Sequence, residues 1–121
     1  MSLRWEQVVV DSQDPFRLAR WWSEALDWPI VYQSEDENDP DPEVEVGPES
    51  GAHPTILFIR VPGSKTIKNR LHFDFVPDDQ DAEVERLLAL GATRADIGQD
   101  EVSWVVLADP EGNEFCVLSA R

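Results

Sequence analysis

The chain has 121 residues, 41% of them apolar, which predicts one domain with a substantial core. Its formal net charge of −15 disfavours nucleic acid and anionic membranes as partners, because like charges repel. This acidity is typical of a solubilising surface and would also suit a salt-tolerant host. We expect no secretory leader and no membrane span. Cys116 is the single cysteine, which excludes an intramolecular disulfide and favours the cytoplasm.

In the first half, Asp14 and Pro15 are typical of a helix start, and Pro29 ends the helical pattern. Residues 34–43 are acidic and contain proline, which predicts a solvated loop rather than a metal site. Strands are expected at residues 3–11, 30–33, 44–46 and 55–61.

The second half repeats this order. A helix is expected between Asp78 and Leu90, with Gly91 as its C-terminal stop. Residues 109–112 read Asp-Pro-Glu-Gly, the composition of a tight turn. Strands are expected at residues 71–76, 93–97, 102–108 and 114–118.

The two halves have nearly equal internal spacing, since the interval from Gln7 to Leu26 almost matches that from His72 to Leu90. Each half reads as one strand, one helix and three strands, so the predicted class is α+β. We therefore expect a duplicated domain, with module 1 at residues 3–62, a linker at 63–68 and module 2 at 69–119. The linker region is basic, and a solvated connection is favoured over an anion-contacting rim.

The stretch from Val105 to Phe115, VVLADPEGNEF, resembles the closing motif of the vicinal oxygen chelate superfamily. This superfamily includes glyoxalase I, extradiol dioxygenases and the bleomycin- and fosfomycin-resistance proteins. The likeness extends to residues 14–28, 71–75 and 88–92, and residues 68–72 look most like the glyoxalase-like subfamily. The resemblance implies two βαβββ modules that form a cupped sheet around a small-molecule cavity, and a homodimer.

Strand alternation predicts which side chains face this cavity. Leu71, Phe73 and Phe75 are expected to pack under the helix, so that His72 and Asp74 point the other way. Gln7 is expected on the equivalent side of the first module. In the last strand, Phe115 and Val117 are predicted core residues, whereas Glu114, Cys116 and Leu118 face the cavity.

The resemblance implies metal-ligand positions at Gln7, Phe58, His72 and Cys116. Phenylalanine cannot bind a metal, and Cys116 stands where an acid is expected. Glu114 could replace that acid if the backbone shifted, or Gln7, His72 and Cys116 could hold zinc. A site without a tightly bound metal is favoured, with a divalent metal as the alternative cofactor.

His72 is the main catalytic candidate, because imidazole suits proton transfer near neutral pH, and Asp74 or Glu114 would be its partner. Residues expected to contact a ligand are Trp5, Gln7, Phe58, Trp104 and Cys116.

Together these features predict a cytoplasmic protein that binds a small organic molecule, either to sequester it or as a metal-free enzyme. The alternative is a metal-dependent lyase, isomerase or dioxygenase of the glyoxalase type. A third class, an interaction module without a ligand, is compatible with the acidic surface and the five tryptophans.

Overall fold

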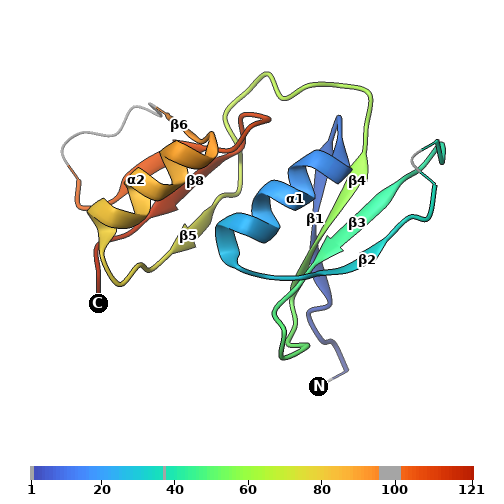
Figure 1. The fold of residues 1–121 in the computed structure, drawn as a ribbon, viewed down its shortest axis with the longest axis horizontal. Coiled ribbons are helices and arrows are strands. Elements are labelled where there is room, and N and C mark those ends of the chain that lie inside the picture. The colour runs from blue at the N-terminus through green and yellow to red at the C-terminus, as the bar shows by residue number, and fades with distance from the viewer. Residues whose placement is uncertain (1, 37, 96–101) are drawn as a thin grey trace. The chain divides into compact units, whose positions relative to one another are not determined.

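The computed structural model describes residues 2–36, 38–95 and 102–121. The chain divides into two compact units, one ending at Ser64 and the other starting at Lys65. In the described residues each unit combines one helix with a four-stranded mixed sheet, as Figure 1 shows, which confirms the predicted α+β class. Neither helix in these ranges has the length and hydrophobicity that crossing a bilayer requires.

The first unit contains, in chain order, β1 (Gln7–Ser12), α1 (Pro15–Leu26), β2 (Ile30–Gln33), β3 (Glu43–Val46) and β4 (Thr55–Arg60). The strands lie side by side in the order β1-β4-β3-β2. The edge strand β1 is parallel to β4, and the other pairs are antiparallel. Helix α1 packs on one face of this sheet, against β3 and β4 (Figure 1).

Helix α1 begins and ends where the sequence predicts. The side chain of Asp14 accepts a hydrogen bond from the backbone N–H of Arg17 at 3.2 Å, which caps the first turn. Pro15 follows at the first helical position, where its missing N–H has no cost. Asp27 ends the helix in the left-handed conformation, with φ at 55°. Leu18 and Trp22 are buried on the face that meets the sheet.

The core of the first unit lies between α1 and the sheet. In the register of the strands, Phe58 pairs with Val10 on one side and with Val44 on the other. Phe58 and Val44 are both 0% exposed. Side chains of paired residues point to the same face of a sheet, so this row forms the helix-facing layer.

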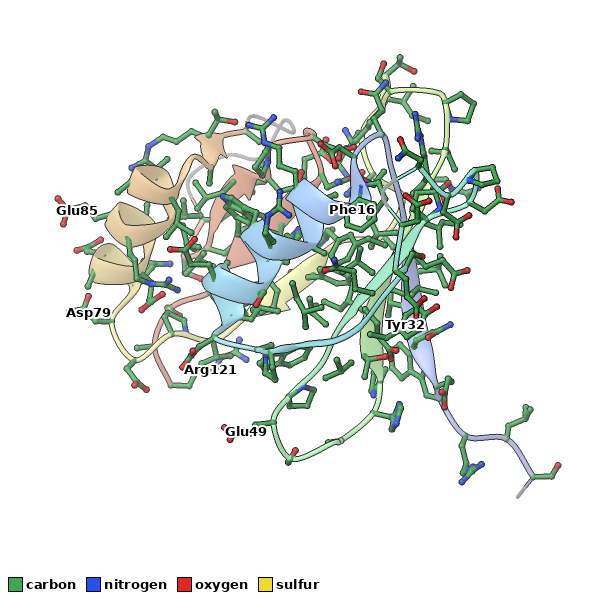
Figure 2. All side chains as sticks on the ribbon, turned by 45° about the vertical axis from the view of Figure 1, so that its right-hand side comes forward. Phe16, Tyr32, Glu49, Asp79, Glu85 and Arg121 are labelled. Carbon is green, nitrogen blue, oxygen red and sulfur yellow. The ribbon has the colours of Figure 1, made fainter. Side chains whose placement is uncertain are left out.

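The second unit contains β5 (Phe73–Phe75), α2 (Gln80–Leu90), β6 (Thr93–Arg94), β7 (Val105–Ala108) and β8 (Glu114–Val117). Its strand order is β5-β8-β7-β6, with β5 parallel to β8, which repeats the pattern of the first unit. Asp79 caps the start of α2, where Figure 2 labels it, and Gly91 ends this helix with φ at 115°. The predicted internal repeat is therefore present in the order of the strands.

The Asp-Pro-Glu-Gly turn between β7 and β8 is organised by a buried carboxylate. Asp109 is buried, and one of its oxygens accepts hydrogen bonds from the backbone N–H groups of Glu111 at 2.9 Å and Asn113 at 3.0 Å. The side chain of Asn113 donates to the same carboxylate. Gly112 adopts a positive φ of 87°, which an L side chain rarely tolerates. These contacts fix the start of β8, which carries part of the candidate site.

Several strands are shorter than predicted. The first strand begins at Gln7 instead of residue 3, and β5 covers three residues instead of 71–76. Leu71, expected under the helix, is 86% exposed because it precedes β5 and pairs with no strand in the described residues. Of the strand expected at residues 93–97, the first two residues form β6. Residues 96 and 97 lie outside the described ranges.

Candidate functional site

The candidate site lies on the face of the second sheet that is opposite α2. Phe75 pairs with Val117, and the rings of Phe75 and Phe115 lie with their centroids 6.0 Å apart. These three side chains lie on the face of the sheet that meets α2. Asp74 pairs with Cys116 in the parallel β5–β8 ladder. Because successive side chains alternate, Asp74 and Cys116 share the other face. The alternation in the sequence predicts this face for both residues.

Three side chains with different chemistry meet on this face. Nδ1 of His72 lies 2.9 Å from a carboxylate oxygen of Asp74 and 3.9 Å from the sulfur of Cys116. The nitrogen, oxygen and sulfur atoms all lie within 4.8 Å of one another. His72 is the residue that immediately precedes β5, and Asp74 is the middle residue of that strand. The sequence names all three as candidates, and the structure places them together.

The imidazole presents a single nitrogen, Nδ1, to both neighbours. With Nδ1–H donating to Asp74, the lone pair of the neutral ring is on Nε2. No residue in the described ranges hydrogen-bonds Nε2. A catalytic triad would need the carboxylate and the nucleophile on opposite ring nitrogens. The group is therefore a histidine–aspartate pair with an adjacent thiol, and Nε2 is the atom left for a ligand.

Cys116 is held in its protonated form. Burial, together with the charge of Asp74 and a hydrogen bond to it, raises the pKa of the Cys116 thiol to about 11, against a smaller opposing effect of Lys68. The residue is 3% exposed. At neutral pH the thiol is neutral, and a nucleophilic thiolate is not available.

Asp74→Asn is expected to lower the pKa of Cys116 from about 11 toward the ordinary value of 9.0, because the substitution removes a negative charge that opposes thiolate formation. Burial remains, so the pKa should stay above that ordinary value. The single cysteine allows a direct measurement by carbon NMR of labelled cysteine across a pH titration. Asp81→Asn, on the exposed side of α2, is the matched control. An unchanged Cys116 midpoint in Asp74→Asn would contradict the proposed contact.

Glu114, expected as an acid near the site, has other partners. One carboxylate oxygen lies 2.9 Å from Nζ of Lys65, and the other accepts from the backbone N–H of Asn69 at 3.1 Å. The side chain of Asn69 also contacts the backbone of Glu114. Burial raises the pKa of Glu114, but the hydrogen bonds from Lys65 and Asn69 lower it by more. The pKa of Glu114 is therefore below its ordinary value. Glu114 thus joins segment 65–69 to β8.

The contacts of Lys65 and Asn69 with Glu114 are not predicted from the sequence. Both residues belong to the basic segment for which a solvated connection is favoured from the sequence. The available signal was the presence of a cation and an amide just before His72, combined with an acid at the start of the last strand. Only their distances to Glu114 identify them as partners.

One equivalence expected in the first unit is wrong by one residue. The resemblance places Phe58 at the position that corresponds to Cys116, facing the cavity. The register pairs Phe58 with Val10 and Val44 in the helix-facing core, and a side chain that is 0% exposed offers no surface to a ligand. Leu57, which pairs with Val9, occupies the other face and is the corresponding position.

Gln7, Trp5 and Trp104 remain predicted ligand contacts. Gln7 lies at the start of β1, paired with Thr55, and is half-buried. Trp5 precedes β1 and Trp104 precedes β7, and both are exposed. Gln7 and Trp5 belong to the first unit, whereas Trp104 belongs with His72 to the second. A joint role of Gln7 and His72 therefore remains a prediction.

The side chains at the metal-ligand positions that the resemblance implies are poorly suited to bind a metal. Both oxygens of Glu114 are engaged by Lys65 and Asn69, and the Cys116 thiol carries its proton. A second set exists, because His72, Asp74 and Cys116 offer nitrogen, oxygen and sulfur atoms within 4.8 Å. This set suits zinc by chemistry, but binding would break the His72–Asp74 contact and release the thiol proton.

The repeated strand order gives each unit the βαβββ arrangement that the sequence predicts. Residues 7–118 match the model of the glyoxalase-like domain, and the chain belongs to that family. Among curated proteins, no relative matches the sequence.

Several solved structures share the fold at low sequence identity. Glyoxalase I of Leishmania major is 17% identical with a TM-score of 0.72, over 98% of this chain and 87% of that one. FosX of Mesorhizobium loti, a fosfomycin resistance protein, is 18% identical with a TM-score of 0.71, over 98% and 92% of the two chains. FosX of Listeria monocytogenes, solved with Mn(II) and sulfate, is 15% identical with a TM-score of 0.74, over 100% and 95%.

Proposed function

We propose that this glyoxalase-like protein binds a small organic molecule at the face that carries His72, and that it works without a tightly bound metal. The supporting observation is the 2.9 Å contact between Nδ1 of His72 and Asp74, which leaves Nε2 for the ligand. The role is either sequestration or metal-free proton transfer. The fold neighbours are a glyoxalase I and fosfomycin resistance proteins, and these activities belong to those proteins.

The geometry suggests how His72 would move a proton. Asp74 accepts Nδ1–H and so fixes the tautomer whose Nε2 is a base. When Nε2 takes a proton from an acidic C–H or O–H group of the ligand, the imidazolium that forms is stabilised by the adjacent carboxylate. The buried, neutral thiol of Cys116 adds no competing charge to the site.

His72→Gln is expected to abolish ligand binding at this face without unfolding the protein, because the side chain lies outside the core. The measurement is a ligand-observed NMR screen of small organic molecules against the wild type and the variant, with thermal unfolding monitored by circular dichroism. Arg94→Gln, on β6, is the matched surface control. For each molecule that binds, hydrogen–deuterium exchange of its acidic C–H groups distinguishes proton transfer from sequestration.

Binding that persists in His72→Gln would overturn the proposal, and so would a screen in which no small molecule binds. If His72→Gln alone failed to fold, Asp74→Asn would provide the same test, because it removes the carboxylate that orients the ring. Retained binding with unchanged exchange in that variant would contradict the role of the pair.

A metal-dependent lyase, isomerase or dioxygenase is the second candidate function. The observation that favours it is the cluster of His72, Asp74 and Cys116, whose donor atoms lie within 4.8 Å. The test is elemental mass spectrometry after dialysis against zinc, nickel, manganese or iron(II). Close to one retained equivalent per chain, lost in His72→Gln and Cys116→Ser, would replace the metal-free proposal.

We further propose a homodimer in the cytoplasm. The family resemblance supports the dimer, and the single free cysteine suits a reducing compartment. Light scattering coupled to size-exclusion chromatography measures the oligomeric state directly.

A further inference from the structure

The segment from Lys65 to Arg70 concentrates positive charge next to the candidate site. Lys65, Lys68 and Arg70 are three of the ten basic residues in a chain whose net charge is −15. The segment ends two residues before His72. A local excess of cations in an acidic protein can serve to anchor the segment or to bind an anion.

The segment is anchored to the second sheet and is not a free linker. Lys65 and Asn69 both contact the carboxylate of Glu114, at 2.9 Å and 3.1 Å. Lys68 lies between these anchored positions, so its backbone is fixed beside β8. Glu114 and Cys116 lie two residues apart on the same face of that strand. The anchoring therefore holds Lys68 close to the face that carries Cys116 and His72.

The charge of Lys65 is already matched by Glu114, but that of Lys68 is not. Within the described ranges Lys68 forms no ion pair, and its ammonium contacts only the backbone carbonyl of Asn69, at 3.4 Å. Its positive charge acts on the thiol of Cys116, where it opposes the rise of that pKa. Asp74 is engaged by His72. In the described ranges Lys68 and Arg70 are both exposed and have no carboxylate partner, and Lys68 is the one whose charge acts on Cys116. No described residue hydrogen-bonds Nε2 of His72.

We propose that the molecule bound at the His72 face is a small organic anion, whose charged group pairs with Lys68 while Nε2 of His72 contacts an adjacent polar group. This inference rests on the proposed function and specifies its substrate class. The negative charges elsewhere on the chain do not prevent it, because charges farther away than about 8 Å are largely screened at physiological ionic strength. Carboxylates, phosphates and phosphonates share the required chemistry.

The test is a titration of the ¹⁵N-labelled wild-type protein with inorganic phosphate at constant ionic strength, followed by amide chemical shifts. Saturable shifts are expected for residues 68–74 and 115–117. Lys68→Gln should weaken phosphate binding about tenfold, which corresponds to roughly 1.4 kcal/mol. Lys68→Arg keeps the charge and should remain within about twofold of the wild type. Arg94→Gln removes an exposed charge on β6 and should match the wild type.

The absence of saturable shifts at these residues would overturn the inference, and so would equal affinities in Lys68→Gln and the wild type. The screen with His72→Gln separates this failure from that of the proposed function. If neutral or cationic molecules bind in a His72-dependent manner while anions do not, the anion assignment fails and the small-molecule function stands. If no molecule of any charge binds, both fail.

Discussion

Phe58→Ala is expected to lower the free energy of unfolding by about 4 kcal/mol, because it removes a completely buried aromatic side chain and leaves a cavity. Phe58 lies in the row with Val10 and Val44, under α1, where neighbouring side chains cannot move in without disturbing the helix. The measurement is equilibrium unfolding in urea, followed by tryptophan fluorescence. An effect of this size would place the first unit near the limit of stability for a small domain.

Leu57→Ala is the matched control for Phe58→Ala. Leu57 is the adjacent residue of β4, half-buried and on the opposite face of the sheet. Its truncation should cost clearly less, about 1–2 kcal/mol. If Leu57→Ala proved the more damaging of the two, the register of β4 would be wrong and the equivalence of Leu57 with Cys116 would have to be abandoned.

Glu114→Gln is expected to lower the free energy of unfolding by about 2 kcal/mol at neutral pH, since the amide loses the charge-assisted bonds to Lys65 and Asn69. The Glu114 side chain is only 12% exposed, so solvent screens the contact weakly. Loss of the contact should also loosen segment 65–69, which precedes His72. Amide hydrogen exchange of this segment should therefore rise in the variant.

The effect of Glu114 should depend on pH in a defined direction. The pKa of Glu114 is lowered in the folded protein, so its stabilisation is fully present above the ordinary value of 4.5 and is lost as the pH falls through the lower folded value. The stability difference between the wild type and Glu114→Gln should be constant near neutral pH and should shrink on acidification. Glu85→Gln is the control, because Glu85 is exposed on α2 and projects outward in Figure 2. A difference that grew toward low pH would contradict the assigned contacts.

Features that depend on near neighbours in the chain could be predicted from the sequence. Asp14 with Pro15 starts α1, and Gly91 ends α2, because caps and helix stops act within a few residues. The turn around Asp109 is another local feature, held by bonds to residues two and four positions later. The repeat and the family motif extend these signals to the α+β class and the paired fold.

The predicted facing of side chains agrees with the structure where strand alternation alone decides it. Phe115 and Val117 are core residues, and Asp74 and Cys116 share the opposite face. Alternation relates residues within one strand, so it needs no knowledge of the partner strand. The resemblance, and not alternation, places Phe58 at the position equivalent to Cys116. That placement is wrong because it depends on the register between β1 and β4, which the sequence of either strand leaves open.

The sequence by itself determined the elements, their repeated order, the family and the identity of His72, Asp74 and Cys116 as candidates. The tertiary structure decided that Asp74 contacts Nδ1 of His72, that Glu114 is committed to Lys65 and Asn69, and that Leu71 is exposed. Lys65 and Glu114 are 49 positions apart in the chain. Contacts at such separation depend on strand pairing and side-chain packing across the whole unit, and local propensity carries no information about them.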